Sequence, residues 1–419
     1  MGLETQSNSD STLSLEELSR LAETAGVQVV GQLIQKRDRP DSRYYVGRGK
    51  AQELREKCET LEADLVIFDV ELSAVQVRNL EELLDCRVLD RTNVILDIFA
   101  QRARTREGKL QVELAQLRYL LPRLIGKGIT LSRLGAGIGT RGPGETKLET
   151  DRRHIRKRIS FLEHEMEVIR QRRKLQRDRR DRLGLPVVAL VGYTNAGKST
   201  LLNSLSQAAT LVEDQLFSTL DTLSRVVKLP DGRRVLVSDT VGFVRKLPHH
   251  LVAAFRATLE EVKEADLILH VIDLSSPDME NQKKAVELVL RELEAQNNPT
   301  LLVYNKADLV EAKQIEWIGL GESHNAVIIS AQKGQGIPEL LQQVALGLSR
   351  PGAEVDLEFP LAETRLLSLI HEHGKVLSQD YLDDRIKVTA WVEPQFWDQV
   401  RPYVVRGSLV DLGADSRNA

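Results

Sequence analysis

Cysteine is nearly absent from this sequence. Only Cys58 and Cys86 occur among 419 residues, and they form neither a Cys-x-x-Cys pair nor the framework of a disulfide-stabilised domain. No stretch approaches the ~20 apolar residues that a membrane span needs. Met1–Ser14 is polar and acidic and lacks the apolar core of a signal peptide. We therefore predict a soluble, cytoplasmic protein without a membrane span, a monomer with about two to four domains.

Acidic and basic residues are unevenly distributed along the chain. The net charge is only −3, but Gln101–Arg182 contains 23 Lys and Arg against 10 Asp and Glu, which is a net +13 and leaves −16 elsewhere. A basic segment in an otherwise acidic protein predicts a polyanionic partner, most simply a nucleic acid.

The most specific motif is a strand that leads into a phosphate-binding loop. The β-branched run that begins at Val187 enters a G-x-x-x-x-G-K-S pattern, followed by a predicted helix over Leu201–Leu205. In this pattern the loop amides and Lys198 bind phosphates, and the hydroxyl of Ser199 binds Mg²⁺. The predicted nucleotide-binding residues of this loop are Gly192, Tyr193, Thr194, Asn195, Ala196, Gly197, Lys198, Ser199 and Thr200.

A second apolar strand ends in D-x-x-G. Here Asp239 is predicted to hold Mg²⁺, and the amide of Gly242 is predicted to meet the terminal phosphate of the nucleotide. The motif comprises Asp239, Thr240, Val241 and Gly242. Alone it is a weak signal, but it follows the phosphate loop in the order expected of a nucleotide switch.

Two further strand ends predict which base is bound. The motif N-K-x-D consists of Asn305, Lys306, Ala307 and Asp308, and Ser330, Ala331 and Gln332 follow the next strand. A carboxylate at Asp308 accepts hydrogen bonds from both the ring N–H and the exocyclic amine of guanine, whereas adenine offers no such pair of donors. The sequence thus predicts a GTP/GDP site within an α/β domain.

Between the first two motifs lies a candidate switch segment. We predict that Thr219 closes on Mg²⁺ and the terminal phosphate when GTP is bound. Its neighbours belong to the same predicted site, which here comprises Phe217, Ser218, Thr219, Leu220 and Asp221. The metal ligands are then Ser199, Thr219 and Asp239.

Phe243 occupies the position after Gly242, where many signalling GTPases have a glutamine that orients water. Hydrolysis then depends on a partner or on a cation. The carbonyl oxygen of Asn195 is suited to hold K⁺ beside the phosphates, although an asparagine in a left-handed turn has the same appearance in sequence. We assign the catalytic roles to Lys198, Thr219, Gly242 and Asn195.

The basic segment contains two leucine- and isoleucine-rich stripes with coiled-coil spacing. One runs from Leu110 to Leu124 and the other from Ile155 to Ile169, and a glycine-rich stretch, Ile125–Lys147, separates them. We predict two antiparallel helices, the second from near Thr150 to near Arg182. The glycine-rich tip is interpreted as an RNA-binding loop, with a flexible linker as the alternative. The cations of the second helix either bind phosphates or pair at i,i+4 with Glu163, Glu165, Glu167 and Asp178.

Four regions follow from these patterns. Residues 1–104 form an α/β subdomain with predicted strands Val27–Ile34, Leu65–Phe68 and Arg87–Leu89 in a parallel sheet, residues 105–185 the basic hairpin, residues 186–350 a P-loop GTPase domain, and residues 351–419 a small α+β domain. Gly47–Lys50 resembles half a phosphate loop, which leaves ATP binding by the first region open beside a plain turn.

Taken together, the four motifs and the segment Gly135–Arg153 resemble the HflX family of GTPases related to translation factors. The resemblance covers nearly all of the chain. It implies a cytoplasmic GTPase that binds the large (50S) ribosomal subunit, with the hairpin tip reaching toward the peptidyl-transferase centre, and that splits or rescues stalled ribosomes under stress. The alternatives are a GTP-dependent RNA-docking switch and a GTPase that assists a tRNA-modifying enzyme.

Overall fold

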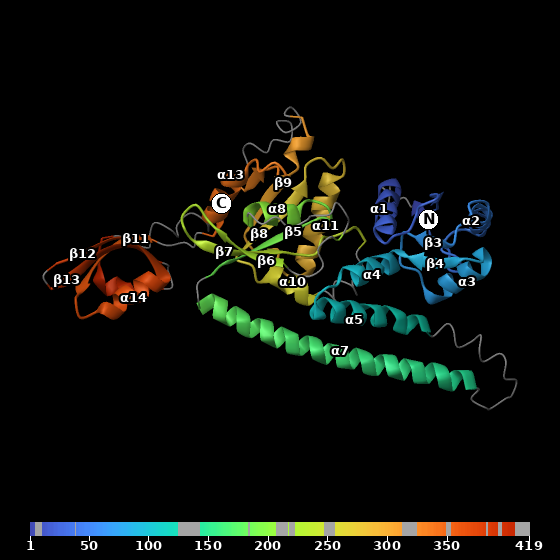
Figure 1. The fold of residues 1–419 in the computed structure, drawn as a ribbon, viewed down its shortest axis with the longest axis horizontal. Helices are drawn as coiled ribbons and strands as arrows, with labels where there is room; N and C mark the ends of the chain where they lie inside the picture. The colour runs from blue at the N-terminus through green and yellow to red at the C-terminus, as the bar shows by residue number, and fades with distance from the viewer. Residues whose placement is uncertain are drawn as a thin grey trace.

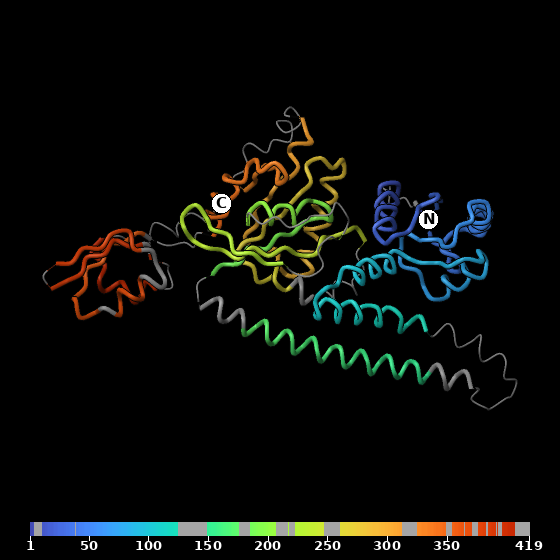
Figure 2. Tube along the Cα trace, in the orientation of Figure 1, coloured from blue at the N-terminus to red at the C-terminus, as the bar shows by residue number. Residues whose placement is uncertain are grey.

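The computed structural model describes residues 1–4, 11–37, 39–124, 143–182, 185–206, 217, 223–246, 256–311, 325–348, 353–382, 384–392 and 396–406. A central sheet lies between an N-terminal α/β region and a C-terminal β-rich region (Figure 1). A long helical pair runs along one side of the N-terminal region and the central sheet. The tube in Figure 2 shows the same course of the chain.

The central region contains a six-stranded sheet. Its order is β10 (Ala326–Ile328), β9 (Thr300–Asn305), β8 (Leu267–Asp273), β5 (Val187–Gly192), β7 (Arg234–Asp239) and β6 (Leu223–Lys228). The first five strands are parallel, and β6 is antiparallel to β7. The carboxyl ends of the parallel strands therefore meet at one edge, where the four predicted motifs lie.

Helices cover both faces of this sheet. Val188 and Leu190 of β5 pack with α8 (Lys198–Ser206) and α13 (Ile337–Gly347) on one face. Ala189 and Val191 of the same strand pack on the other face with α10 (Arg256–Lys263) and α11 (Met279–Glu292). Because alternate residues of a strand point to opposite faces, a continuous apolar run is what a strand between two helical layers requires. The predicted α/β fold is confirmed.

The N-terminal region departs from the prediction at two points. Its strands form two parallel pairs, β1 (Gly2–Glu4) with β2 (Ile34–Lys36) and β3 (Leu65–Phe68) with β4 (Arg87–Asp90). The strand predicted over Val27–Ile34 is wrong, because only Ile34 of that run joins a ladder, opposite Gly2.

Helices make up the rest of the N-terminal region. They are α1 (Ser11–Thr24), α2 (Arg48–Thr60), α3 (Ala74–Leu84) and α4 (Arg91–Arg102). The sequence patterns missed α1, which buries Leu15, Leu18 and Leu21 on one face. Gly47 precedes the first residue of α2, as expected of a turn that starts a helix.

The basic segment forms the predicted pair of antiparallel helices, α5 (Arg106–Arg123) and α7 (Pro143–Arg182). Helix α7 begins at Pro143, seven residues before the predicted start near Thr150, so the end of the glycine-rich tip is helical. Proline fits the first turn of a helix because its missing N–H would have no intrahelical partner there. The rest of the predicted tip, residues 125–142, lies outside the described residues.

Ion pairs join the two helices of the hairpin. Nε and Nη2 of Arg158 donate to the two carboxylate oxygens of Glu113 on α5 at 2.7 and 2.8 Å. Arg118 and Arg106 of α5 contact Glu163 and Glu165 of α7 at 2.7 and 2.5 Å. Glu163 and Glu165 therefore pair across the hairpin with α5, which differs from the alternative of i,i+4 pairing within the second helix.

The C-terminal region is a small α+β unit, as predicted. Four antiparallel strands have the order β12 (Gly374–Tyr381), β13 (Arg385–Val392), β11 (Ala353–Pro360) and β14 (Val404–Arg406). Helix α14 (Thr364–His373) and the short helices α15 (Trp397–Val400) and η5 (Arg401–Tyr403) complete it. Its core includes Val355, Leu357, Phe359 and Val388.

Within the described residues, no helix combines the length and the apolar composition needed to cross a bilayer.

Candidate functional site

The loop between β5 and α8 has the shape of a phosphate cradle. Asn195 and Gly197 both have a positive φ, 62° and 93°, so the loop turns through the left-handed region twice. A side chain at Gly192 would collide with the carbonyl oxygen of Val271 on the neighbouring strand, and one at Gly197 would collide with the amide of Asn305. The glycines of the motif are thus required by close packing at this edge.

Lys198 closes over the cradle from the first turn of α8. Its Nζ donates to the carbonyl oxygens of Gly192 at 3.1 Å and Tyr193 at 2.9 Å, and its side chain is buried. Burial lowers the pKa of Lys198 to about 8, although Asp239 opposes the shift. An incoming phosphate would add negative charge beside this ammonium and favour its charged form.

This pKa predicts a pH dependence of nucleotide binding. A bound phosphate favours the charged form of Lys198 and raises its pKa, so affinity is fully expressed below about pH 8 and falls as the pH rises above it. We expect the Kd for GDP to increase about fourfold between pH 7 and pH 8.5. Titration calorimetry in matched buffers measures this change, and equal affinities at the two pH values would show that Lys198 stays charged in the free protein.

Ser199 and Asp239 form the candidate magnesium site. The register places Asp239 of β7 opposite Leu190 of β5, and the hydroxyl of Ser199 donates to Oδ2 of Asp239 at 2.6 Å. A hydroxyl and a carboxylate are the hard oxygen ligands that Mg²⁺ takes beside nucleotide phosphates, so the donor set fits this ion. Within the described residues, no group of three or more His, Cys, Asp or Glu forms another candidate metal site.

The D-x-x-G segment is held against the cradle by backbone hydrogen bonds. The amide of Thr194 donates to the carbonyl oxygen of Phe243 at 2.7 Å, and the amide of Phe243 donates to Gly192 at 3.1 Å. The hydroxyl of Thr240 donates to the carbonyl oxygen of Leu190 at 2.7 Å. A Cβ on Gly242 would lie 2.9 Å from Thr194 Cγ2 and 3.1 Å from Lys198 Nζ. The backbone at Gly242 therefore lies close against the cradle and Lys198.

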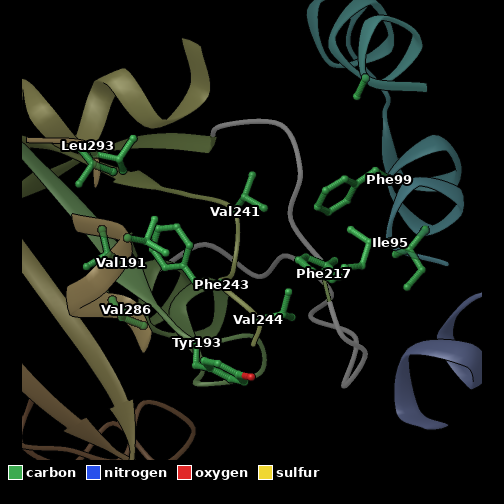
Figure 3. Close-up of a cluster of buried hydrophobic side chains, with 14 of the residues drawn as sticks. Ile95, Phe99, Val191, Tyr193, Phe217, Val241, Phe243, Val244, Val286 and Leu293 are labelled. Carbon is green, nitrogen blue, oxygen red and sulfur yellow. The ribbon is translucent and has the colours of Figure 1, made fainter. Parts of the chain in front are cut away.

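Phe243 contributes packing at this site. Its ring is 2% exposed and lies in the same apolar cluster as Val191 and Val241 (Figure 3). An apolar ring has no group that polarises water. Phe243 therefore cannot orient the attacking water as a glutamine at this position would.

Asn305 joins the cradle to the loop after β10. Its Nδ2 donates to the carbonyl oxygen of Ala196 at 2.9 Å, and its Oδ1 accepts from the amide of Ala331 at 2.9 Å. Asn305 therefore connects the phosphate end of the site to the base end.

Thr200 lies half-buried in the first turn of α8.

Asp308 lies where the base is expected. It belongs to the short helix η2 (Ala307–Leu309), and its Oδ1 accepts from the hydroxyl of Ser330 at 2.6 Å. That hydrogen bond lowers the pKa of Asp308, so the carboxylate is ionised and accepts hydrogen bonds at neutral pH. Lys306 has a φ of 65° and pairs with Asp273 at 2.8 Å. Gln332 is exposed.

Asp273 is a residue of this site that the motifs did not identify. It ends β8 and fixes the side chain of Lys306, and its only sequence signal is a carboxylate at the end of an apolar strand.

The predicted switch segment is described only at Phe217. This residue is buried, and its ring packs edge-on against Phe99 of α4 with centroids 4.7 Å apart. Ser218, Thr219, Leu220 and Asp221 lie outside the described residues, so the role of Thr219 stays a prediction.

Three family models match the chain in sequence order. Residues 12–100 match the N-terminal region of a GTP-binding GTPase, and residues 102–180 match the middle region of the same kind of protein. Residues 187–306 match a model described as a 50S ribosome-binding GTPase.

Curated relatives match over nearly the whole length. GTPase HflX of Caldanaerobacter subterraneus subsp. tengcongensis is 51% identical over 94% of this chain and 90% of its own length. GTPase HflX of Escherichia coli (strain K12) is 44% identical over 95% of this chain and 93% of its own length. Among solved structures, a GTP-binding protein from Sulfolobus solfataricus in complex with GDP is 24% identical, covers 83% of this chain and 97% of its own, and has a TM-score of 0.43.

Proposed function

The chain belongs to the HflX family of GTPases, and on that premise we propose that it binds the large ribosomal subunit in its GTP-bound form and splits or rescues stalled ribosomes. The chain is a GTPase, and the cradle, the Ser199–Asp239 pair and Asp308 are the proposed binding sites for phosphate, Mg²⁺ and guanine. GTP turnover then serves this contact with the ribosome, and the protein acts in the cytoplasm.

The observation that carries the proposal is a basic helical pair attached to the GTPase region. Helix α7 has 40 residues and is about 60 Å long. Arg170 and Arg173 of α7 contact Glu260 and Glu261 of α10 at 2.7 and 3.4 Å, so the helix is fastened directly to the nucleotide-binding region. Other cations of α7 are exposed along its length, namely Arg153, Lys157, Arg172 and Lys174. Such cations bind phosphates of structured RNA with little dependence on sequence.

GTP would control this contact through the two segments nearest the terminal phosphate. In the proposed cycle, the phosphate and Mg²⁺ order the segments around Thr219 and Gly242 and favour the ribosome-bound arrangement. Hydrolysis removes the phosphate and releases both segments. Because Phe243 cannot orient water, we propose that the ribosomal subunit supplies the stimulation and that K⁺ held by Asn195 assists it. The left-handed conformation of Asn195 also suits a plain turn, so K⁺ stays a prediction.

Cosedimentation with purified large ribosomal subunits tests the proposal. We expect binding with a non-hydrolysable GTP analogue and at least about tenfold weaker binding with GDP, together with faster GTP hydrolysis when subunits are added. Alanine at Arg153, Lys157, Arg172 and Lys174 should weaken binding at least about tenfold and reduce its salt dependence.

The matched control carries alanine at four exposed cations on other elements, namely Arg20, Lys228, Arg234 and Lys284. It has the same change in net charge and should bind like the wild type. Equal binding in GTP analogue and GDP, or equal loss in both variants, would refute the proposed use of the hairpin.

A further inference from the structure

Thr194 carries a buried hydroxyl without a hydrogen-bond partner. The residue is 7% exposed, and within the described part of the chain its Oγ1 meets neither a donor nor an acceptor. A threonine hydroxyl offers one donor and two acceptor positions, and leaving them unused in a buried place costs free energy. Because buried polar groups of native proteins nearly always have partners, a group that enters with the nucleotide would explain this hydroxyl.

Thr194 lies on the phosphate side of the cradle. Val191 and Tyr193 pack in one apolar cluster (Figure 3), and the hydroxyl of Tyr193 donates to Oε2 of Glu17 on α1 at 2.6 Å. The bridge between Tyr193 and Phe243 shows that the chain is still extended here, and residues of an extended chain alternate between its two sides. The alternation therefore places Thr194 on the opposite side, which is the side that α8 covers.

Three groups from the cradle and the D-x-x-G segment meet beside Thr194. The amide of Thr194 donates to the carbonyl oxygen of Phe243 at 2.7 Å, which holds the two segments together. A Cβ on Gly242 would lie 2.9 Å from Thr194 Cγ2 and 3.1 Å from Lys198 Nζ. The ammonium of Lys198, the backbone at Gly242 and the side chain of Thr194 thus border one small space.

The attacking water of this site has no glutamine to hold it. Phe243 occupies the position where many GTPases have that glutamine, and its ring is buried. Neighbouring hydroxyls are already engaged, since those of Tyr193, Ser199 and Thr240 donate to oxygens of the protein. The hydroxyl of Thr194 borders the same space and has no such partner within the described residues.

We propose that Thr194 is a catalytic residue that holds the attacking water of GTP hydrolysis. Its hydroxyl accepts a hydrogen bond from the water and donates one to an oxygen of the terminal phosphate, so that the water is fixed beside the phosphorus. This inference rests on GTP binding in the cradle and does not require the ribosome. A ribosomal subunit or K⁺ would accelerate a reaction whose water Thr194 positions.

The bonds of this step follow from the hydrolysis itself. The oxygen of the water bonds to the terminal phosphorus as the bond from that phosphorus to the bridging oxygen of GDP breaks. One proton of the water passes to an oxygen of the same phosphoryl group, and the other stays on the new P–OH. GDP and inorganic phosphate leave, and Thr194 keeps its own proton throughout.

Two substitutions in the full-length protein test this role. Thr194→Val keeps the shape of the side chain and removes the hydroxyl, whereas Thr194→Ser keeps the hydroxyl. Single-turnover hydrolysis is measured without ribosomes at saturating GTP, so that binding does not limit the rate, and the Kd for GDP is measured separately. We expect Thr194→Val to lower the rate at least about tenfold with the Kd for GDP within about twofold of the wild type, and Thr194→Ser to recover at least about a third of the wild-type rate.

The matched control is Thr92→Val. Thr92 of α4 is fully buried, and its hydroxyl also has no partner in the described part of the chain, but it belongs to neither the cradle nor the D-x-x-G segment. This variant should hydrolyse GTP at the wild-type rate.

Three outcomes would overturn the role of Thr194 and leave the nucleotide site standing. They are a wild-type rate in Thr194→Val, a rate in Thr194→Ser as low as that of Thr194→Val, and a GDP affinity in Thr194→Val that falls as much as the rate does. A wild-type protein that binds neither GTP nor GDP would overturn the site itself, and the role of Thr194 with it.

Discussion

Replacing Asp308 by asparagine is expected to weaken GDP binding about 10- to 100-fold and to create affinity for xanthosine diphosphate. The amide oxygen of the new side chain still accepts from the hydroxyl of Ser330, which now contacts Oδ1 of Asp308 at 2.6 Å. Its amide nitrogen then faces the base. A donor there opposes the exocyclic amine of guanine but matches the carbonyl oxygen that xanthine has at the same position.

Competition of both diphosphates against a fluorescent nucleotide measures this exchange of specificity. Asp384→Asn, an exposed aspartate of the C-terminal region, is the matched control and should behave like the wild type. If Asp308→Asn bound GDP as well as the wild type does, Asp308 would not be the group that reads the base. If it bound neither nucleotide, the side chain would be needed for the shape of the loop.

Replacing Gly242 by alanine is expected to lower the rate of GTP hydrolysis at least about 100-fold while the Kd for GDP changes less than about threefold. The added methyl group would lie 2.9 Å from Thr194 Cγ2 and 3.1 Å from Lys198 Nζ. It displaces the amide of residue 242 from the terminal phosphate, which GDP does not have. The loss should therefore appear in turnover and in binding of the GTP analogue.

Single-turnover hydrolysis and GDP titration separate these two effects. Gly49→Ala in α2 serves as the control, because a Cβ there would meet nothing within 4 Å. Unchanged turnover in Gly242→Ala would show that the D-x-x-G amide takes no part in catalysis, and a large loss of GDP affinity would mean that the cradle itself had collapsed.

Most of the central sheet could be predicted from sequence, because four of its five parallel strands are apolar runs that end in a recognisable polar motif; β8 has no such motif and was not predicted. The carboxyl ends of such strands share one edge, so four separate motifs specify one site before any distance is known. Helix α1 was missed because its apolar stripe, Leu15, Leu18 and Leu21, is short and lies among serines and glutamates.

Contacts between the regions could not be predicted from the sequence patterns. Glu17 and Tyr193 are 176 residues apart, and no local periodicity relates them. The start of α7 was also misjudged, because glycines near Pro143 indicated a loop although a proline in the first turn stabilises a helix. The predicted domain boundaries stay predictions.

The attachment of α7 to α10 has a mechanical consequence. Between the ion pairs of Arg170 and Arg173 and the residue at which α7 begins, Pro143, the helix extends about 40 Å without a break. A tilt of about 5° at the anchored end would swing the opposite end by about 3.5 Å, because displacement grows with the length of a rigid rod. A small tilt at the attachment to α10 would therefore move the far end of α7 by roughly the length of an ion-pair contact.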